Sequence, residues 1–130
     1  MKYWMTYLVS CFLILGSCVG YSQNPIVDSL RNILNTTKDD TLKIDVYNSL
    51  FDEYEFEDDI LAEEYITKAL ALAKKINDKE HQADVHINFG YLAEDRSDFE
   101  GALQNYFEAL KLFRESGNQK GVSFALNNIG

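Results

Sequence analysis

Cysteine and proline are scarce in this sequence, which has two of the first and one of the second. Both cysteines, Cys11 and Cys18, lie near the N-terminus, so the chain beyond them has no disulfide, no cysteine-ligated metal and no cysteine nucleophile. The one proline, Pro25, can start a short leading helix, because proline fits the first helical turn. On that helix we expect four apolar side chains to face inward: Ile26, Leu30, Ile33 and Leu34.

Basic residues are few as well. The sequence has 12 Lys and Arg against 21 Asp and Glu, for a formal net charge of −9. An acidic surface repels phosphate backbones and anionic membrane surfaces, so we do not expect the chain to bind nucleic acid.

Sequence motifs for catalysis are absent. There is no G-x-x-x-x-G-K-[ST] loop, no G-x-G-x-x-G turn and no G-x-S-x-G elbow. His81 and His86 are five residues apart, so they do not share a helix face and make a poor metal pair, and His86 is expected in the core. We therefore predict no catalytic, cofactor or metal residue and no enzyme activity for this part of the protein.

The run from Asp52 to Asp59 holds six carboxylates in eight residues. Its spacing, without a central glycine, does not match a calcium-binding EF-hand loop. A solvated turn with acids that cap a helix start is the simpler interpretation, because the helix dipole favours negative charge there.

Residues 1–22 have the layout of a secretory signal peptide. Lys2 is followed by no further charge until Asp28, and an apolar core over residues 7–15 leads into small residues. An uncleaved membrane anchor is the alternative, since Tyr3 to Tyr21 is uncharged for nearly the width of a bilayer. We therefore predict an exported protein, in the periplasm or cell envelope of a bacterium.

Two cleavage sites compete at the end of this segment. Gly20 and Ser22 offer small residues before Gln23, which suits ordinary signal peptidase and is the preferred site. The stretch from Leu15 to Cys18 resembles a bacterial lipobox, in which the cysteine is lipidated and starts the mature chain.

An exported domain without disulfides needs another source of stability, and stacked repeats would supply one.

A repeat with a period of forty residues is visible. Six residues recur at this distance: Ala62, Ala69, Leu70, Leu72, Asn88 and Gly90 recur as Ala102, Ala109, Leu110, Leu112, Asn128 and Gly130. Apolar residues at helical spacing predict two helices in each unit. We divide the chain into 1–22, the signal peptide; 23–38, a linker or leading helix; 39–77 and 78–117, two units; and 118–130, the first helix of an incomplete third.

Capping residues mark the expected helix ends. In the second unit Asp78 can start the first helix, Ser97 and Glu100 have the spacing of a capping box, and Gly117 can end the second helix before Asn118 starts the next. In the first unit the corresponding residues are Asp40, either Asp58 or Asp59, and Asn77.

The order of small and large residues resembles the tetratricopeptide repeat, whose pattern is W-x₂-L-G-x₂-Y in the first helix and A-x₃-F with a later Ala in the second. The first-helix slots read His86, Phe89, Gly90 and Ala93, and Tyr47, Leu50, Phe51 and Tyr54; the second-helix slots read Ala102, Tyr106 and Ala109, and Ala62, Ile66 and Ala69. The resemblance, over residues 39–130, implies an all-α solenoid of antiparallel helix pairs. The sequence departs from the pattern in its period of forty, in Phe51 at a slot normally small, and in a first unit that needs a turn one residue shorter.

In this family the first helices line a concave face where peptides dock. The resemblance implies nine groove-facing residues: Asp45, Asn48, Asp52, Asp84, Ile87, Tyr91, Glu94, Phe124 and Asn127. None is basic, so a basic or neutral partner is expected rather than an acidic one. Asn48, Asn88 and Asn127 can either hydrogen-bond a peptide backbone or pack within the helix pair.

An exported signal followed by long repeats is similar to the sensor region of bacterial histidine kinases that contain tetratricopeptide repeats. The third unit stops at Gly130 within a first helix, so we expect the N-terminal part of a longer, signal-transducing protein. A periplasmic or lipid-anchored scaffold is the alternative, and the regulatory arm of a transcription factor or cyclase is a third. The membrane is expected to be reached only through the signal, a lipid on Cys18, or a segment beyond Gly130.

Overall fold

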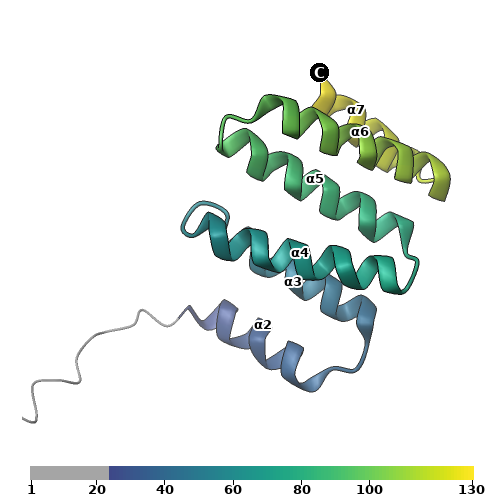
Figure 1. Ribbon diagram of the computed structural model, residues 1–130. Helices are drawn as coiled ribbons and strands as arrows, with labels where there is room; N and C mark the ends of the chain where they lie inside the picture. Colours follow the sequence, from purple (N-terminus) through teal and green to yellow (C-terminus); the bar gives the residue numbers. More distant parts are fainter. Residues whose placement is uncertain (1–23) are drawn as a thin grey trace, which may run out of the picture.

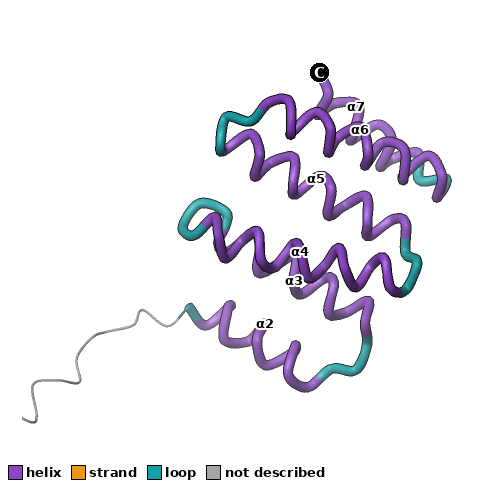
Figure 2. Tube along the Cα trace, in the orientation of Figure 1, coloured by secondary structure: helices purple, strands orange, loops and turns teal. Residues whose placement is uncertain are grey.

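The computed structural model describes residues 24–130, and this part of the chain consists of helices and short turns without strands. It contains six helices (Figure 2): α2 Pro25–Thr36, α3 Asp40–Tyr54, α4 Asp59–Lys75, α5 Lys79–Asp95, α6 Phe99–Ser116 and α7 Gln119–Ile129. The prediction of an all-α fold is confirmed for these residues. The predicted signal peptide, residues 1–22, lies outside them.

The helices are stacked in chain order from α2 at one end to α7 at the other (Figure 1). The most extensive packing joins α5 with α6 and α3 with α4, and each helix also packs on the next one along the chain. Helix α3 additionally contacts α5, although α4 lies between them in the sequence. Helices α3 and α5 therefore lie next to each other, and polar side chains can meet between them.

Buried positions repeat from one helix pair to the next. In α3 and α5 the offset is 39 residues, and in α4 and α6 it is 40: Ile44 matches Ala83, Val46 matches Val85, Phe51 matches Gly90, Ala62 matches Ala102, Ile66 matches Tyr106 and Ala69 matches Ala109. The first unit thus has one residue fewer between the buried positions of its two helices, as expected, but the turn itself is not the shorter part. Helix α3 is shorter than α5, with 15 residues against 17, while its following turn, residues 55–58, is longer than the turn of residues 96–98.

Acidic and amide side chains start the helices much as the sequence predicts. Asp58 caps α4, Asp78 caps α5 and Asn118 caps α7, each by accepting a hydrogen bond from a backbone N–H one turn ahead. The cap of α3 is Asp39 rather than Asp40, because the Asp39 carboxylate accepts from the backbone N–H groups of residues 41 and 42 at 2.9 and 3.2 Å. Asp40 is already within the helix.

Residues in the left-handed backbone conformation end three of the helices. Gly117 has φ of 78° after α6 and Asn77 has φ of 55° after α4, as predicted. Ser97 also has a positive φ, 59°, so it closes the end of α5 instead of starting α6. The predicted capping box of Ser97 and Glu100 is therefore wrong, and Asp98 caps α6 by accepting from the Gly101 N–H at 2.9 Å.

The core consists of three clusters that lie between successive helices. The first joins α2, α3 and α4 around Leu50, the second joins α3, α4 and α5 around Phe51 and Ile66, and the third joins α5, α6 and α7 around Tyr106. On α2, Leu30, Ile33 and Leu34 pack against the first cluster as predicted, but Ile26 is 55% exposed and Val27 is buried in its place. The buried stripe of α2 thus runs through positions 27, 30 and 34, and residue 26 lies about 100° around the helix from its start.

The two complete helix pairs place the larger of two facing buried residues on opposite helices. In the second pair α5 carries Gly90 and α6 carries Tyr106, and a Cβ atom added at Gly90 would lie 2.1 Å from a ring carbon of Tyr106. In the first pair the equivalent positions are Phe51 and Ile66, both fully buried in one cluster. A large residue on one helix is therefore matched by a smaller residue on its partner in both pairs.

Candidate functional site

The predicted groove residues are distributed over three helices: Asp45, Asn48 and Asp52 on α3, Asp84, Ile87, Tyr91 and Glu94 on α5, and Phe124 and Asn127 on α7. Asp45, Asp52, Asp84, Glu94, Phe124 and Asn127 are exposed, and Asn48 and Tyr91 are half-buried. Ile87 is 3% exposed, because it packs in the core cluster that joins α5, α6 and α7. Ile87 therefore stabilises the fold and offers no surface to a partner.

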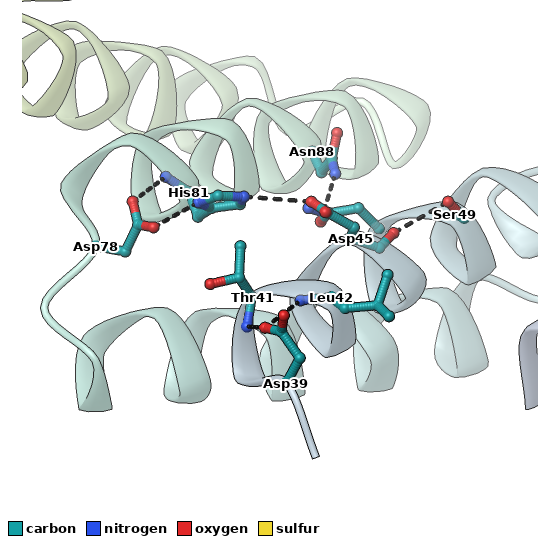
Figure 3. Close-up of polar contacts among 9 residues, drawn as sticks. Asp39, Thr41, Leu42, Asp45, Ser49, Asp78, His81 and Asn88 are labelled. Carbon is teal, nitrogen blue, oxygen red and sulfur yellow. Dashed lines mark hydrogen bonds and ion pairs between the residues drawn. The ribbon is translucent and has the colours of Figure 1, made fainter. Parts of the chain in front are cut away.

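Polar side chains of α3 and α5 meet directly. The Asn88 amide on α5 donates to the Asn48 amide oxygen on α3 at 3.2 Å. The ring of His81 on α5 lies between two carboxylates, with Nδ1 2.7 Å from Asp78 and Nε2 3.2 Å from Asp45 (Figure 3). Sequence reasoning did not place His81 at this face. The bond between Asn48 and Asn88 joins the first helices of two successive pairs, which is neither of the two roles considered for these residues.

The two carboxylates around His81 favour its protonated form. Partial burial of the ring would lower its pKa, but the hydrogen bonds and negative charges of Asp78 and Asp45 outweigh burial and raise the pKa above its ordinary value. In return, the pKa of Asp78 is lowered: burial opposes this change, and the hydrogen bonds from the backbone and ring of His81 produce it. A protonated His81 thus ties the start of α5 to α3.

Asp84 is the most strongly perturbed carboxylate of this face. Although its side chain is exposed at the surface, desolvation of the carboxyl raises its pKa from 3.8 to about 6. The nearby charges of Glu80, Asp78 and Asp45 raise it further, while His81 lowers it. Asp84 forms no ion pair among residues 24–130, and its charged neighbours are three carboxylates, which raise its pKa, and His81, which lowers it.

We expect Asp84 to make the folded chain less stable as the pH rises from about 4 to about 6. Its pKa is raised on folding, so over this window the folded state binds more protons than the unfolded state, and the free energy of unfolding falls with increasing pH. Asp84→Asn should therefore stabilise the chain at pH 7.5, by about 1 kcal/mol or less because solvent screens an exposed carboxyl. Urea unfolding across this pH range measures the difference, which should disappear below the unfolded pKa of 3.8.

His81→Gln is a matched control for the pH range of that effect. The folded pKa of His81 is also raised, so its contribution to stability is present below the unfolded value of 6.5 and is lost at higher pH. The two variants should therefore differ from the parent in separate pH windows. A destabilising effect of Asp84→Asn at pH 7.5 would contradict the assignment of Asp84.

A second group of carboxylates lies where α3 and α5 end. The pKa of Glu55 is raised by partial burial and by the charges of Asp52 and Asp95, and that of Asp52 is raised by burial and by Glu53. Asp52, Glu55 and Asp95 form no ion pair among the residues described. Carboxylates of two helices are thus held near one another without a neutralising cation.

Cations are instead paired along the second helices. Arg96 contacts Asp59 through Nε at 3.0 Å and Glu63 at 2.8 Å, and Lys68 bonds Glu64 at 2.5 Å. The acidic run of residues 52–59 is therefore divided. Asp58 caps α4, as a helix-capping turn predicts, and Asp59 binds Arg96, while Glu55 lies near Asp95 of α5.

His86, expected in the core, is half-buried, packs near Phe89 and has Nδ1 3.0 Å from the Asn105 amide oxygen.

Two open hollows lie elsewhere on the surface. One is lined by residues at the ends of α4 and α6, among them Asn77, Lys79 and Ser116, and the other lies between α3 and α4 around Tyr47 and Lys68. Neither of these two hollows includes a predicted groove residue.

Within residues 24–130, no three His, Cys, Asp or Glu side chains are placed to hold a metal ion. None of the helices in this part combines the length and apolar character needed to cross a bilayer. The most distinctive polar feature is the set of exposed carboxylates on α3 and α5. These two helices are joined by the contact of His81 with Asp45 and by the bond between Asn88 and Asn48. No family model matches this chain, and no curated protein matches it with significant similarity.

Proposed function

We propose that this chain is an exported tetratricopeptide-type module that binds a basic or neutral peptide across the face formed by α3, α5 and α7. The observation that carries this proposal is the charge distribution. Asp45, Asp52, Asp84 and Glu94 are exposed on α3 and α5, and none of the nine predicted groove residues is basic, while Lys68 of α4 and Arg96 after α5 are engaged in ion pairs. Clustered acidic groups attract a basic peptide and speed its association.

The repeated burial pattern supports the tetratricopeptide assignment. Small residues are buried at equivalent places in α4 and α6, and Gly90 lets the ring of Tyr106 approach the backbone of α5. These are slots at which the repeat pattern requires a small residue, a glycine and an aromatic residue. Stacked helix pairs of this kind present an extended surface formed by their first helices.

Binding is tested with peptides of matched length that are basic, neutral or acidic. The full chain should associate with the basic peptide faster than with the acidic one at low salt, and added salt should reduce this difference. Asp84→Lys with Glu94→Lys should slow association with the basic peptide by several-fold, because two attractive charges become repulsive. Stopped-flow fluorescence with a labelled peptide measures the rate.

The control is an equal change of charge on another surface. Glu100→Lys with Glu108→Lys alters two acids of α6, and circular dichroism verifies that both variants are folded. If the two double variants reduce the association rate equally, net charge rather than this face controls binding. If the parent chain binds none of the three peptides, the proposed function is wrong.

We further propose that the mature protein lacks the N-terminal segment. Its basic start, apolar core and small-residue exit are those of an export signal. Mass spectrometry of the protein from its native host should find a chain that begins at Gln23, or at a lipidated Cys18. A mature chain that retains Met1 to Gly16 would contradict export by cleavage.

We propose that the module is the sensor region of a histidine kinase, and the alternative is that it is part of an envelope scaffold protein. The coding sequence beyond Gly130 separates them. A transmembrane helix followed by a phosphoacceptor histidine segment and a glycine-rich ATP lid would support the kinase. Further repeats up to a stop codon would support the scaffold.

A further inference from the structure

Tyr106 carries a buried polar atom without a partner. Its side chain is 1% exposed, and its hydroxyl has no hydrogen-bond partner. The ring is fixed against α5, because a Cβ at Gly90 would overlap it and because the ring of Tyr91 packs edge-on at 6.1 Å between centroids. A buried hydroxyl without a partner is costly, so one that persists in a native fold calls for a reason beyond packing.

The Tyr106 hydroxyl lies at the acidic end of α3 and α5. Glu94 is one helical turn beyond Gly90, on the same side of α5. Burial raises the pKa of Tyr106 well above its ordinary value, and among its titratable neighbours Glu94 contributes most, followed by Tyr91 and Asp95. Glu94 lies near enough to the phenol to raise its pKa as an acceptor, but the two groups do not reach the distance and angle of a full hydrogen bond, so the Tyr106 hydroxyl is unpaired in this structure.

Helix α3 extends the same site. Partial burial raises the pKa of Tyr91, a hydrogen bond with Asn128 of α7 lowers it, and the charges of Glu94 and Glu55 raise it further, so carboxylates from α5 and from the end of α3 lie near Tyr91. Glu55 is in turn affected by Asp52 and Asp95. We call this group the acidic end, and it consists of Asp52, Glu55, Tyr91, Glu94, Asp95 and Tyr106.

A guanidinium group fits these surroundings better than a bare metal ion. Among residues 24–130 no three carboxylates come close enough together to hold a metal ion, so the charges of the acidic end are spread over a wider area. A guanidinium is planar, offers five N–H donors in several directions and stacks on aromatic rings. It can therefore contact carboxylates on two helices and the ring of Tyr91 at once.

We propose that the acidic end binds an arginine side chain of the partner, with the guanidinium on Tyr91 between Glu55 and Glu94, and with the Tyr106 hydroxyl as the polar group beneath it. This inference rests on the proposed function, because it assigns one anchor within the peptide-binding face. Glu55 and Glu94 accept hydrogen bonds from the guanidinium, and the Tyr106 hydroxyl, which has no partner in the free chain, gains a polar contact when the guanidinium binds.

The test uses acetyl-arginine amide as the probe and acetyl-citrulline amide, its neutral isostere, as the control. Each is titrated into the full ¹⁵N-labelled chain and followed by amide chemical shifts. We expect arginine, and not citrulline, to shift the amides of Glu55, Tyr91 and Asp95. Equal shifts with both compounds, or shifts spread over the whole chain, would overturn the proposal.

Neutralising variants locate the site. Glu55→Gln with Glu94→Gln should weaken arginine binding by about fivefold or more, as expected for the loss of two partly exposed charge pairs. Asp28→Asn with Glu100→Gln removes the same charge from α2 and α6 and should leave binding unchanged. Equal weakening in both double variants would show a general charge effect and would overturn the assignment.

Tyr106→Phe separates the binding role from a structural role. It keeps the ring and removes only the buried, unpaired hydroxyl, so the free chain should unfold at a higher urea concentration. Arginine binding should nevertheless weaken by about two- to threefold, as for the loss of one polar contact. Stabilisation with unchanged arginine binding would exclude a role for Tyr106.

The arginine-binding test and the peptide-binding test can fail independently of each other. If peptides still bind to the face of α3 and α5 but Glu55→Gln with Glu94→Gln has no effect, only the arginine site is wrong. If arginine binds at the acidic end while no peptide does, the proposed peptide-binding function is wrong and the cation site remains.

Discussion

Replacing Phe51 with alanine is expected to lower the free energy of unfolding by about 3–5 kcal/mol. The ring is 1% exposed and lies in the core cluster that joins α3, α4 and α5. Its removal exposes little new surface to solvent but leaves a cavity between helices that cannot fully close, which adds to the lost burial. Urea unfolding followed by far-UV circular dichroism measures the change.

Phe56→Ala is the matched control, because it makes the same chemical change five residues further along the chain. Phe56 is 82% exposed in the turn between α3 and α4, so its loss should change stability by less than about 0.5 kcal/mol. Similar losses in the two variants would contradict the packing assigned to α3.

Gly90→Ala is expected to destabilise the chain by about 1–3 kcal/mol, although alanine is the better helix former by about 1 kcal/mol. The new methyl group would lie 2.1 Å from a ring carbon of Tyr106, whose buried ring has no free space to move into. Overlap of this size outweighs helix propensity. The same urea experiment measures the effect, and a stabilised variant would show that α5 and α6 can separate readily.

A second substitution identifies the origin of that cost. Tyr106→Ile reproduces the residue that the first helix pair carries at the equivalent position, Ile66, and removes the overlapping ring. In this background Gly90→Ala should be neutral or stabilising by up to about 1 kcal/mol, because only the helix propensity of alanine remains. Equal costs in the two backgrounds would place the strain elsewhere.

The fold could be predicted from the sequence largely because its signals are local. Apolar spacing and caps such as Asp78, Asn118 and Gly117 depend only on residues within one or two helical turns. Ser97 and Asp39 show the limit. Two neighbouring residues can each be able to cap a helix. Which of them does so depends on how the chain turns to pack the next helix, and the local sequence pattern does not contain that information.

The candidate site could be predicted only in part, because it combines residues from two helices. The acidic positions on α3 and α5 follow from the repeat register, but Ile87 is covered by its neighbours in the third core cluster. The bridge from His81 to Asp45 spans 36 residues and depends on the lateral distance between α3 and α5. No spacing within a single helix reveals such a contact.

The exchange of large and small residues between the helix pairs has a consequence for how such a chain can change during evolution. A recombination that joined α3 to α6 would oppose Phe51 to Tyr106, two rings where one fits, and one that joined α4 to α5 would leave a void between Ile66 and Gly90. Duplication or deletion of a whole pair preserves both matches. Insertions and losses are thus tolerated at the turns between pairs and selected against within them, which makes the pair, and not the single helix, the heritable unit of this fold.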